Sequence, residues 1–442
     1  MSEMAAPKGM LGLPKEIYAL FVVRLVVSAG AFVGPFLAMM LTMKLGYDDG
    51  AAGVFMAILA ILSAGGLALG GKLGDTFGRA DVLRTLQAAT ALVFLLCALT
   101  GFNAATPYLI AFALATLSGT WPVINALVAD LAPRERRKEA FSLLYWGNNI
   151  GFSVGPLVAG FLFNSAPRLL FLGNALALGL AAGVVSLFVR HESQSAPAGL
   201  AGPVESPGPA WPEAIAVDSE AAKAAEAARV AEAAREARLS TWSVLRANPV
   251  LILYSLASIL TAFVYNQHTF ALPIFLKDAL GGDAGPKAYG FVMTANGLTV
   301  VLLTGIVVFF SRKMPSLAAV ALASVFYAVG FGAYRFVGGL PLAIGATVIW
   351  TIGEILGATN GNAFIAERAP PAHRSRINSA VSLAHISGNA MAPLVAGPVS
   401  RAFGSAAVWP IVAVLSLVSA IALLAIHRLD SQRSTRFTDP AR

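Results

Sequence analysis

Two stretches of this sequence are copies of each other, and they decide how the chain is built. Residues 125–160 read NALVADLAPRERRKEAFSLLYWGNNIGFSVGPLVAG, and residues 362–397 read NAFIAERAPPAHRSRINSAVSLAHISGNAMAPLVAG. An ungapped offset of 237 residues aligns them with 13 identities in 36 positions, ending in a shared Pro-Leu-Val-Ala-Gly. The sequence therefore predicts two halves of common design.

The composition around this repeat is that of a membrane protein. The 442 residues are 57% hydrophobic and 12% charged, with a mean hydropathy of +0.73, whereas soluble domains carry about 25% charged residues. Apolar runs long enough to cross about 30 Å of hydrocarbon as helices recur along the chain, and their lack of alternation excludes a barrel. We predict an all-α polytopic membrane protein with about twelve transmembrane helices. The predicted spans are 17–43, 51–73, 81–101, 107–130, 138–164, 168–190, 248–276, 287–311, 316–336, 340–367, 375–403 and 406–427.

These spans divide into two pseudo-symmetric six-helix bundles. Residues 1–190 form the N-terminal bundle, 191–246 a cytoplasmic linker with a surface helix, and 247–442 the C-terminal bundle. With six helices in each half, the repeats are parallel, and such repeats place a site near the bilayer midplane between them.

Lys and Arg placement predicts the orientation. Of the 31 Lys and Arg residues, 24 fall in the termini and in one set of alternate loops, and such loops face the cytoplasm. Both termini are then cytoplasmic, in a cell inner membrane. The formal charge of +8 is a topology signal rather than a nucleic-acid footprint, and we expect a monomer in the lipid bilayer.

The loop after the second span carries Gly71-Lys72-Leu73-Gly74-Asp75-Thr76-Phe77-Gly78-Arg79. Its glycines allow close helix approach and a tight turn, while its charges lie at the membrane surface. Together with the duplicated halves, it resembles the signature loop of the major facilitator superfamily, although Thr76 and Ala80 stand at two usual basic positions. The resemblance implies a cytoplasmic gate, with an interfacial charge cluster that only fixes topology as the alternative. The expected gate residues are Gly71, Gly74, Asp75, Gly78, Arg79 and Asp130, with Asp75 facing the start of helix 11 near Ser375.

Helix 5 carries a second motif, Gly151-Phe152-Ser153-Val154-Gly155-Pro156-Leu157-Val158-Ala159-Gly160. It resembles the Gly-Pro motif of the 12-helix drug/proton antiporters in that superfamily, with Ala159 replacing a frequent glycine. The expected motif residues are Gly151, Gly155, Pro156 and Gly160. They let helix 5 bend and pack closely, a role that is either part of the gate or purely structural.

Ionisable residues within the spans are candidates for proton coupling, because such groups are costly in hydrocarbon. Glu354 lies near the middle of helix 10, where an unpaired carboxylate would favour its protonated form. It is otherwise neutralised by Arg24 or a histidine. His268 and His385 can titrate near neutral pH, and Arg24 either takes part or extends toward the interface. The antiporter resemblance predicts an arginine in helix 4, and residues 116–125 contain none.

Amides and aromatic residues suggest a cavity for an amphiphilic ligand. The candidate cavity residues are Tyr145, Trp146, Asn149, Tyr265, Asn266, Gln267 and Asn296. Any of these amides could instead bridge helices.

The sequence contains no phosphate loop, nucleophile elbow or zinc motif. We therefore predict no enzyme, cofactor or metal, but a secondary transporter exchanging protons for hydrophobic or amphiphilic small molecules. The alternatives are a carrier for one metabolite, in either direction, and a transporter-like sensor that signals through its linker. Deleting residues 195–238 would abolish a sensor's output and spare a transporter's flux.

Overall fold

A computed structural model describes residues 12–189, 243, 246, 248–369 and 373–438, and these residues contain helices and no strands. The predicted all-α membrane fold is confirmed. Apart from residues 243 and 246, the predicted linker at 191–246 lies outside the described residues, and so does the N-terminus before residue 12. The division into three parts therefore stays a prediction.

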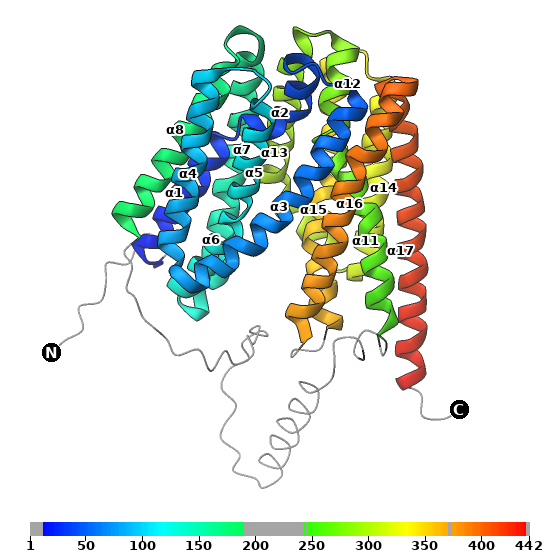
Figure 1. Cartoon of the computed structure of the whole chain (residues 1–442). Coiled ribbons are helices and arrows are strands. Elements are labelled where there is room, and N and C mark those ends of the chain that lie inside the picture. The colour runs from blue at the N-terminus through cyan, green and yellow to red at the C-terminus, as the bar shows by residue number, and fades with distance from the viewer. Residues whose placement is uncertain (1–11, 190–242, 244–245, 247, 370–372, 439–442) are drawn as a thin grey trace, which may run out of the picture.

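Helices of the first half form one bundle (Figure 1). They are α1 (Lys15–Ala29), α2 (Val33–Met39), the π-helix η1 (Met40–Lys44), α3 (Asp49–Phe77), α4 (Arg79–Thr100), α5 (Thr106–Ser118), α6 (Thr120–Leu131), η2 (Arg134–Arg136), α7 (Arg137–Ser165) and α8 (Arg168–Phe188).

The second half repeats the arrangement. Its helices are α11 (Pro249–Tyr265), η3 (Asn266–His268), α12 (Ala271–Leu280), α13 (Ala284–Ser311), α14 (Ser316–Ala333), η4 (Tyr334–Phe336), α15 (Leu340–Arg368), α16 (Arg374–Phe403), η6 (Ser405–Ala407) and α17 (Val408–Thr438).

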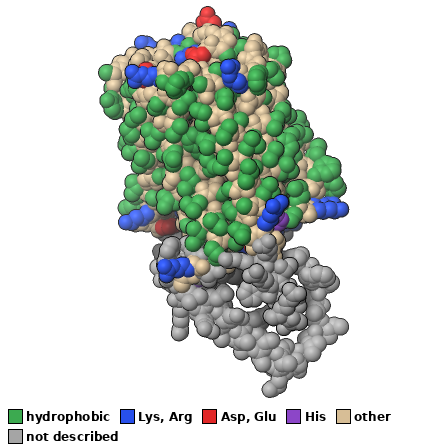
Figure 2. Space-filling view, turned by 90° about the vertical axis from the view of Figure 1, so that its right-hand side faces the viewer, with side chains coloured by type: hydrophobic (Ala, Val, Ile, Leu, Met, Phe, Trp, Pro, Cys, Tyr) green, Lys and Arg blue, Asp and Glu red, His purple; other side chains and the backbone are tan. Residues whose placement is uncertain are grey.

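Ten helical segments of the described residues are long and apolar enough to cross a membrane. The two other long helices are α7 and α16, which correspond to the predicted fifth and eleventh spans. They are less apolar because they carry the small and polar residues of the repeated stretch, which pack against other helices. Figure 2 shows the resulting surface, a broad apolar belt with Lys and Arg side chains toward its two ends.

Two predicted spans are broken rather than continuous. The first predicted span stops at Ala29, the end of α1, and resumes as α2. The seventh stops at Tyr265, the end of α11, and resumes as α12. The offset of 237 residues maps Ala29 onto Asn266, so the two breaks are copies. Irregular backbone inside a membrane needs partners within the protein. Asn174 Oδ1 provides them in the first half by accepting the N–H groups of Phe32 and Val33 at 3.1 and 2.9 Å.

Asn266 serves the corresponding purpose in the second half. Its Nδ2 donates to the Asn389 carbonyl of α16 at 2.9 Å. That carbonyl lies four residues before Pro393, which has no N–H to offer it. The break between α11 and α12 therefore supplies a donor to the carbonyl that Pro393 leaves unpaired in α16.

The two bundles lie side by side and come closest at the end that holds α2 and α12, called here the outer end (Figure 1). The opposite end, where α3 ends at Phe77 and α15 at Arg368, is the predicted cytoplasmic end. At the outer end α7 packs on α13, and α16 packs on α3. A Cβ added to Gly160 would lie 2.6 Å from the Pro286 carbonyl oxygen, and one added to Gly397 would lie 2.5 Å from that of Asp49.

These two contacts are equivalent, because the offset of 237 maps Gly160 onto Gly397 and Asp49 onto Pro286. Hydrogen bonds and an ion pair lie beside these contacts. Asn164 Nδ2 donates to the Gly282 carbonyl at 2.8 Å, Asp49 accepts from Ser400, and Arg401 pairs with Asp48 at 3.5 Å. Contacts of both halves therefore close the outer end.

Candidate functional site

Glu354 forms the centre of a polar cluster inside the C-terminal bundle. It lies in the middle of the 29-residue helix α15, about 21 Å from the predicted cytoplasmic end of that helix at 1.5 Å per residue. Its Oε1 accepts the Tyr265 hydroxyl at 2.8 Å, and its Oε2 accepts Nδ2 of Asn296 at 2.7 Å. The same Nδ2 donates to Thr351 Oγ1 at 3.0 Å. Three helices, α11, α13 and α15, therefore hold one carboxyl group.

Both partners of the carboxyl group are neutral. Among the described residues, no Lys, Arg or His forms a hydrogen bond or ion pair with Glu354. The alternative that Arg24 or a histidine neutralises it is therefore wrong for this conformation. A group of this kind can take up a proton or a cationic ligand to balance its charge.

Aromatic rings enclose the cluster on the side of its own bundle. The Tyr265 ring lies 4.5 Å from His268 and 6.2 Å from Trp350, measured between ring centroids. Trp350 is fully buried and stacks on Phe331 at 5.2 Å. These rings shield the carboxyl group on this side, and apolar surroundings strengthen its electrostatic interactions.

Among the described residues, the other ionisable candidates form no hydrogen bond or ion pair with Glu354. His268 shares a hydrogen bond with the Tyr265 carbonyl at 2.6 Å and stacks on Trp350. His385 is exposed on α16. Arg24 is only 7% exposed, and its guanidinium carbon lies 3.6 Å from the centre of the Trp121 ring of α6. Arg24 therefore brings a positive charge to the helix in which the antiporter arginine is missing.

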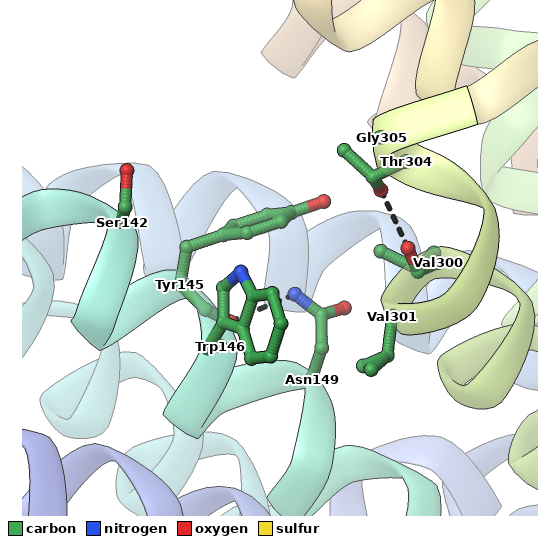
Figure 3. A pocket seen from close by; sticks show the side chains of 8 residues that line it. All are labelled: Ser142, Tyr145, Trp146, Asn149, Val300, Val301, Thr304 and Gly305. Carbon is green, nitrogen blue, oxygen red and sulfur yellow. Dashed lines mark hydrogen bonds between the residues drawn. The ribbon is translucent and has the colours of Figure 1, made fainter. Parts of the chain in front are cut away.

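A cleft of about 260 Å³ opens between α7 and α13 (Figure 3). Three predicted cavity residues, Tyr145, Trp146 and Asn149, lie on its α7 side. Asn149 is held by a hydrogen bond from its Nδ2 to the Tyr145 carbonyl at 2.9 Å. The cleft is lined by Ser142, Tyr145, Trp146, Asn149, Val300, Val301, Thr304 and Gly305.

Two predicted cavity residues have a different position. Asn266 bonds to α16, and Gln267 is fully buried with its Nε2 directed at the Ala392 carbonyl at 3.4 Å. Their amides join η3 to α16, so Gln267 does not line the cleft. Tyr265 and Asn296 instead contact Glu354, as described above.

The predicted gate residues gather at the end of α3 and the start of α4. Arg79 pairs with Asp75 at 3.3 Å and also with Asp130 of α6. Gly78, with φ of 92°, forms the turn between α3 and α4, and Gly71 and Gly74 lie on α3 against α6. In this conformation the ion pairs stay within the N-terminal bundle.

The helix 5 motif divides between two neighbours. Gly151 and Gly155 pack on α1, where added Cβ atoms would meet backbone atoms of residues 25–29. Pro156 and Gly160 pack on α13 at the outer end. One face of the motif therefore holds its own bundle together, and the next turn contacts the other bundle.

Several residues around the site were not predicted. Thr351 lies one helical turn from Glu354 and could have been found from that spacing. Tyr327, whose ring centroid lies 6.1 Å from that of Tyr265, belongs to the cluster, and Val300 and Gly305 line the cleft. These three residues carry no sequence signal, because only the packing of separate helices brings them there.

Comparison with known proteins agrees with this architecture. The family profile described as Major Facilitator Superfamily matches residues 19–384. A protein of Planococcus maritimus named Na(+), Li(+), K(+)/H(+) antiporter is 26% identical over 423 residues, covering 91% of this chain and 93% of the relative. The uncharacterized MFS-type transporter YqjV of Bacillus subtilis (strain 168) is 27% identical over 402 residues, covering 89% and 87%.

Solved structures share the fold at lower identity. A POT family transporter in complex with a thioalcohol-conjugated peptide has a TM-score of 0.72 and 17% identity, covering 96% of this chain and 98% of its own. The nucleoside transporter NupG has a TM-score of 0.68 and 15% identity, covering 93% and 99%. The profile match over most of the chain, together with the duplicated bundles, leads to one conclusion: the chain belongs to the major facilitator superfamily of membrane transporters.

Proposed function

We propose that this transporter is a proton-coupled antiporter that moves amphiphilic small molecules out of the cytoplasm by alternating access. The observation that carries the proposal is Glu354, a carboxyl group in mid-membrane whose hydrogen-bond donors among the described residues are neutral. A proton and a cationic substrate compete for such a group, and this competition couples their movements in opposite directions.

The arrangement of the bundles supports the same cycle. The outer end is closed by the equivalent contacts of Gly160 and Gly397, while the cleft beside Tyr145 lies nearer the predicted cytoplasmic end. This combination fits the state that accepts substrate from the cytoplasmic side. Release of the outer contacts would then expose Glu354 to the opposite side.

The decisive test uses purified protein in liposomes, with a fluorescent cationic dye and an imposed pH gradient. Glu354→Gln keeps hydrogen-bonding capacity but cannot exchange a proton. We expect its gradient-driven dye efflux to fall to the level of protein-free liposomes, while dye binding persists. Glu139→Gln, a change at an exposed position of α7, is the matched control and should pump normally. A Glu354→Gln protein that pumps like wild type would contradict the proposal.

A second candidate is the exchange of alkali cations for protons. It is favoured by the name of the relative from Planococcus maritimus and by the hydroxyl oxygens of Tyr265 and Thr351 near the carboxylate. Alkali cations prefer oxygen ligands of this hard type. Adding Na⁺, Li⁺ or K⁺ to the same liposomes, with an internal pH dye, tests it. If neither dye nor cation moves, a carrier for one defined metabolite becomes the better hypothesis.

A further inference from the structure

The cleft between α7 and α13 begins where the two helices part. At their last close contact, Thr294 Oγ1 donates to the Ser153 carbonyl at 2.7 Å, and a Cβ on Gly297 would lie 2.9 Å from that of Ser153. One turn closer to the predicted cytoplasmic end, Asn149 and Val300 line open space instead. The helices therefore diverge from that contact onward.

One edge of the cleft borders an apolar surface. On α7 the exposed residues Trp146, Ile150 and Val154 follow one another at helical spacing. On α13 the exposed series is Leu298, Leu302 and Ile306. Both series lie on predicted transmembrane helices, where an exposed apolar surface fits contact with lipid. Because Trp146 also lines the cleft, this edge is continuous with that exposed apolar surface.

The opposite edge leads to the polar cluster. Asn296, which donates to Glu354, lies one turn from Val300 on the same face of α13. Tyr145 lines the same cleft from α7. The cleft therefore lies between the lipid-facing surface and the carboxyl group.

We propose that substrates reach Glu354 through this cleft, directly from the bilayer leaflet on the predicted cytoplasmic side. This inference rests on the proposed antiport of amphiphilic molecules. Thr304 lies about 10 Å from the end of α13 at 1.5 Å per residue, which is a depth within that leaflet. Molecules that partition there are already concentrated beside the cleft.

The lining selects the chemistry of the ligand. Tyr145 and Trp146 offer aromatic faces to an apolar or aromatic body, and such faces also attract cations. Asn149 keeps its Oδ1 as an acceptor, since its hydrogen bond to the Tyr145 carbonyl uses Nδ2. The substrate class is therefore an aromatic amphiphile with a cationic or hydrogen-bond-donating head, which moves on to the carboxyl group.

Gly305 allows a direct test. An added Cβ there meets no atom within 4 Å, so Gly305→Leu fills the cleft without a clash. Gly179→Leu on α8 is the matched control, because that glycine is equally unobstructed. Two probes are compared in liposomes under a pH gradient, a bis-benzimide dye that partitions into membranes and methyl viologen, which stays in water.

We expect Gly305→Leu to slow transport of the membrane-borne dye severalfold and to leave methyl viologen and the Gly179→Leu control unchanged. Equal slowing of both probes, or of neither, would overturn access from the leaflet. If wild type moved neither probe, the antiport proposal itself would fail, and the cleft would be judged by labelling alone.

Labelling needs no transport. In a Cys97→Ala background, which removes the single cysteine, Thr304→Cys is exposed to an alkyl maleimide dissolved in the bilayer or to a charged maleimide in water. Faster reaction with the bilayer-borne reagent is the expected result. Reaction with the water-borne reagent alone would overturn the inference.

Discussion

At the scale of residues, one contact occurs at the same place in both halves of the repeat, but its basic partner is present in the first half alone. Arg79 pairs with Asp130 in the first half. The offset of 237 residues maps these two onto Ser316 and Glu367, and there Ser316 Oγ donates to Glu367 Oε1 at 2.7 Å. The same contact is an ion pair in one bundle and a hydrogen bond from a neutral hydroxyl to a carboxylate in the other. The basic member of this pair is thus confined to the N-terminal bundle, where the gate is predicted.

Asp75→Asn tests that gate. Exposed ion pairs such as Asp75–Arg79 contribute only about 0.2–1 kcal/mol, so the variant should fold and express normally. We expect its transport rate to fall severalfold, because the charge of Asp75 is predicted to face the start of α16 in the closed cytoplasmic state. Asp81→Asn, which breaks the neighbouring surface pair with Arg84, is the control. Unchanged flux in Asp75→Asn would contradict the gate and leave the loop with a role in membrane topology alone.

At the scale of elements, the broken helices and the glycine contacts explain the unusual composition of the repeated stretch. Gly151 packs on α1 beside Leu25, and Gly388 packs on α11 with an added Cβ 2.8 Å from that of Ala262. The offset of 237 maps Leu25 onto Ala262 as well. The helices α7 and α16 therefore need small residues on two faces, one toward their own bundle and one toward the other bundle.

Adding a methyl group at these contacts should separate the helices. Gly160→Ala and Gly397→Ala place a Cβ within 2.6 and 2.5 Å of a backbone oxygen, and overpacking of this kind costs about 1–3 kcal/mol. We expect both variants to melt several degrees below wild type in detergent, as followed by intrinsic fluorescence. Gly183→Ala, where a Cβ meets nothing within 4 Å, should melt like wild type. Equal melting of all three would show that the contacts are loose.

At the scale of the whole molecule, the hydrogen bonds at the outer end are expected to favour the conformation closed at that end over the conformation open there. Ser400 donates to Asp49, and Asn164 donates to Gly282, and both bonds join the two bundles. A ligand or a mutation shifts such a balance only by the free energy that differs between the states. Bonds made in one state alone meet that condition.

Removing both bonds should open the outer end. Spin labels at Ala104→Cys and Gly338→Cys, both exposed, report the separation of the bundles by pulsed electron resonance. We expect the double variant Asp49→Ala/Asn164→Ala to add a population at longer distance that is minor in wild type. Asp81→Asn, remote from the outer end, should leave the distribution unchanged. Identical distributions in all three would contradict a role for these bonds.

The membrane class and the two repeated halves could be read from the sequence, which also marked Glu354 as a candidate site. These follow from local signals, because hydrophobic length, an internal repeat and a carboxylate in an apolar run are read along the chain. Tertiary structure alone decided what surrounds Glu354. Tyr265, Asn296 and Thr351 come from three helices, and single-sequence patterns do not encode which helix faces turn toward one another.

Tertiary structure also decided the breaks in helices 1 and 7. Their sequences are apolar enough to read as continuous spans. The interruptions are stable because Asn174 accepts backbone N–H groups at the first break, and because the carbonyl left unpaired by Pro393 accepts Asn266 at the second. The cleft beside Gly305 has the same origin, since it exists only where α7 and α13 diverge. Distances between helices, rather than patterns within them, set the site.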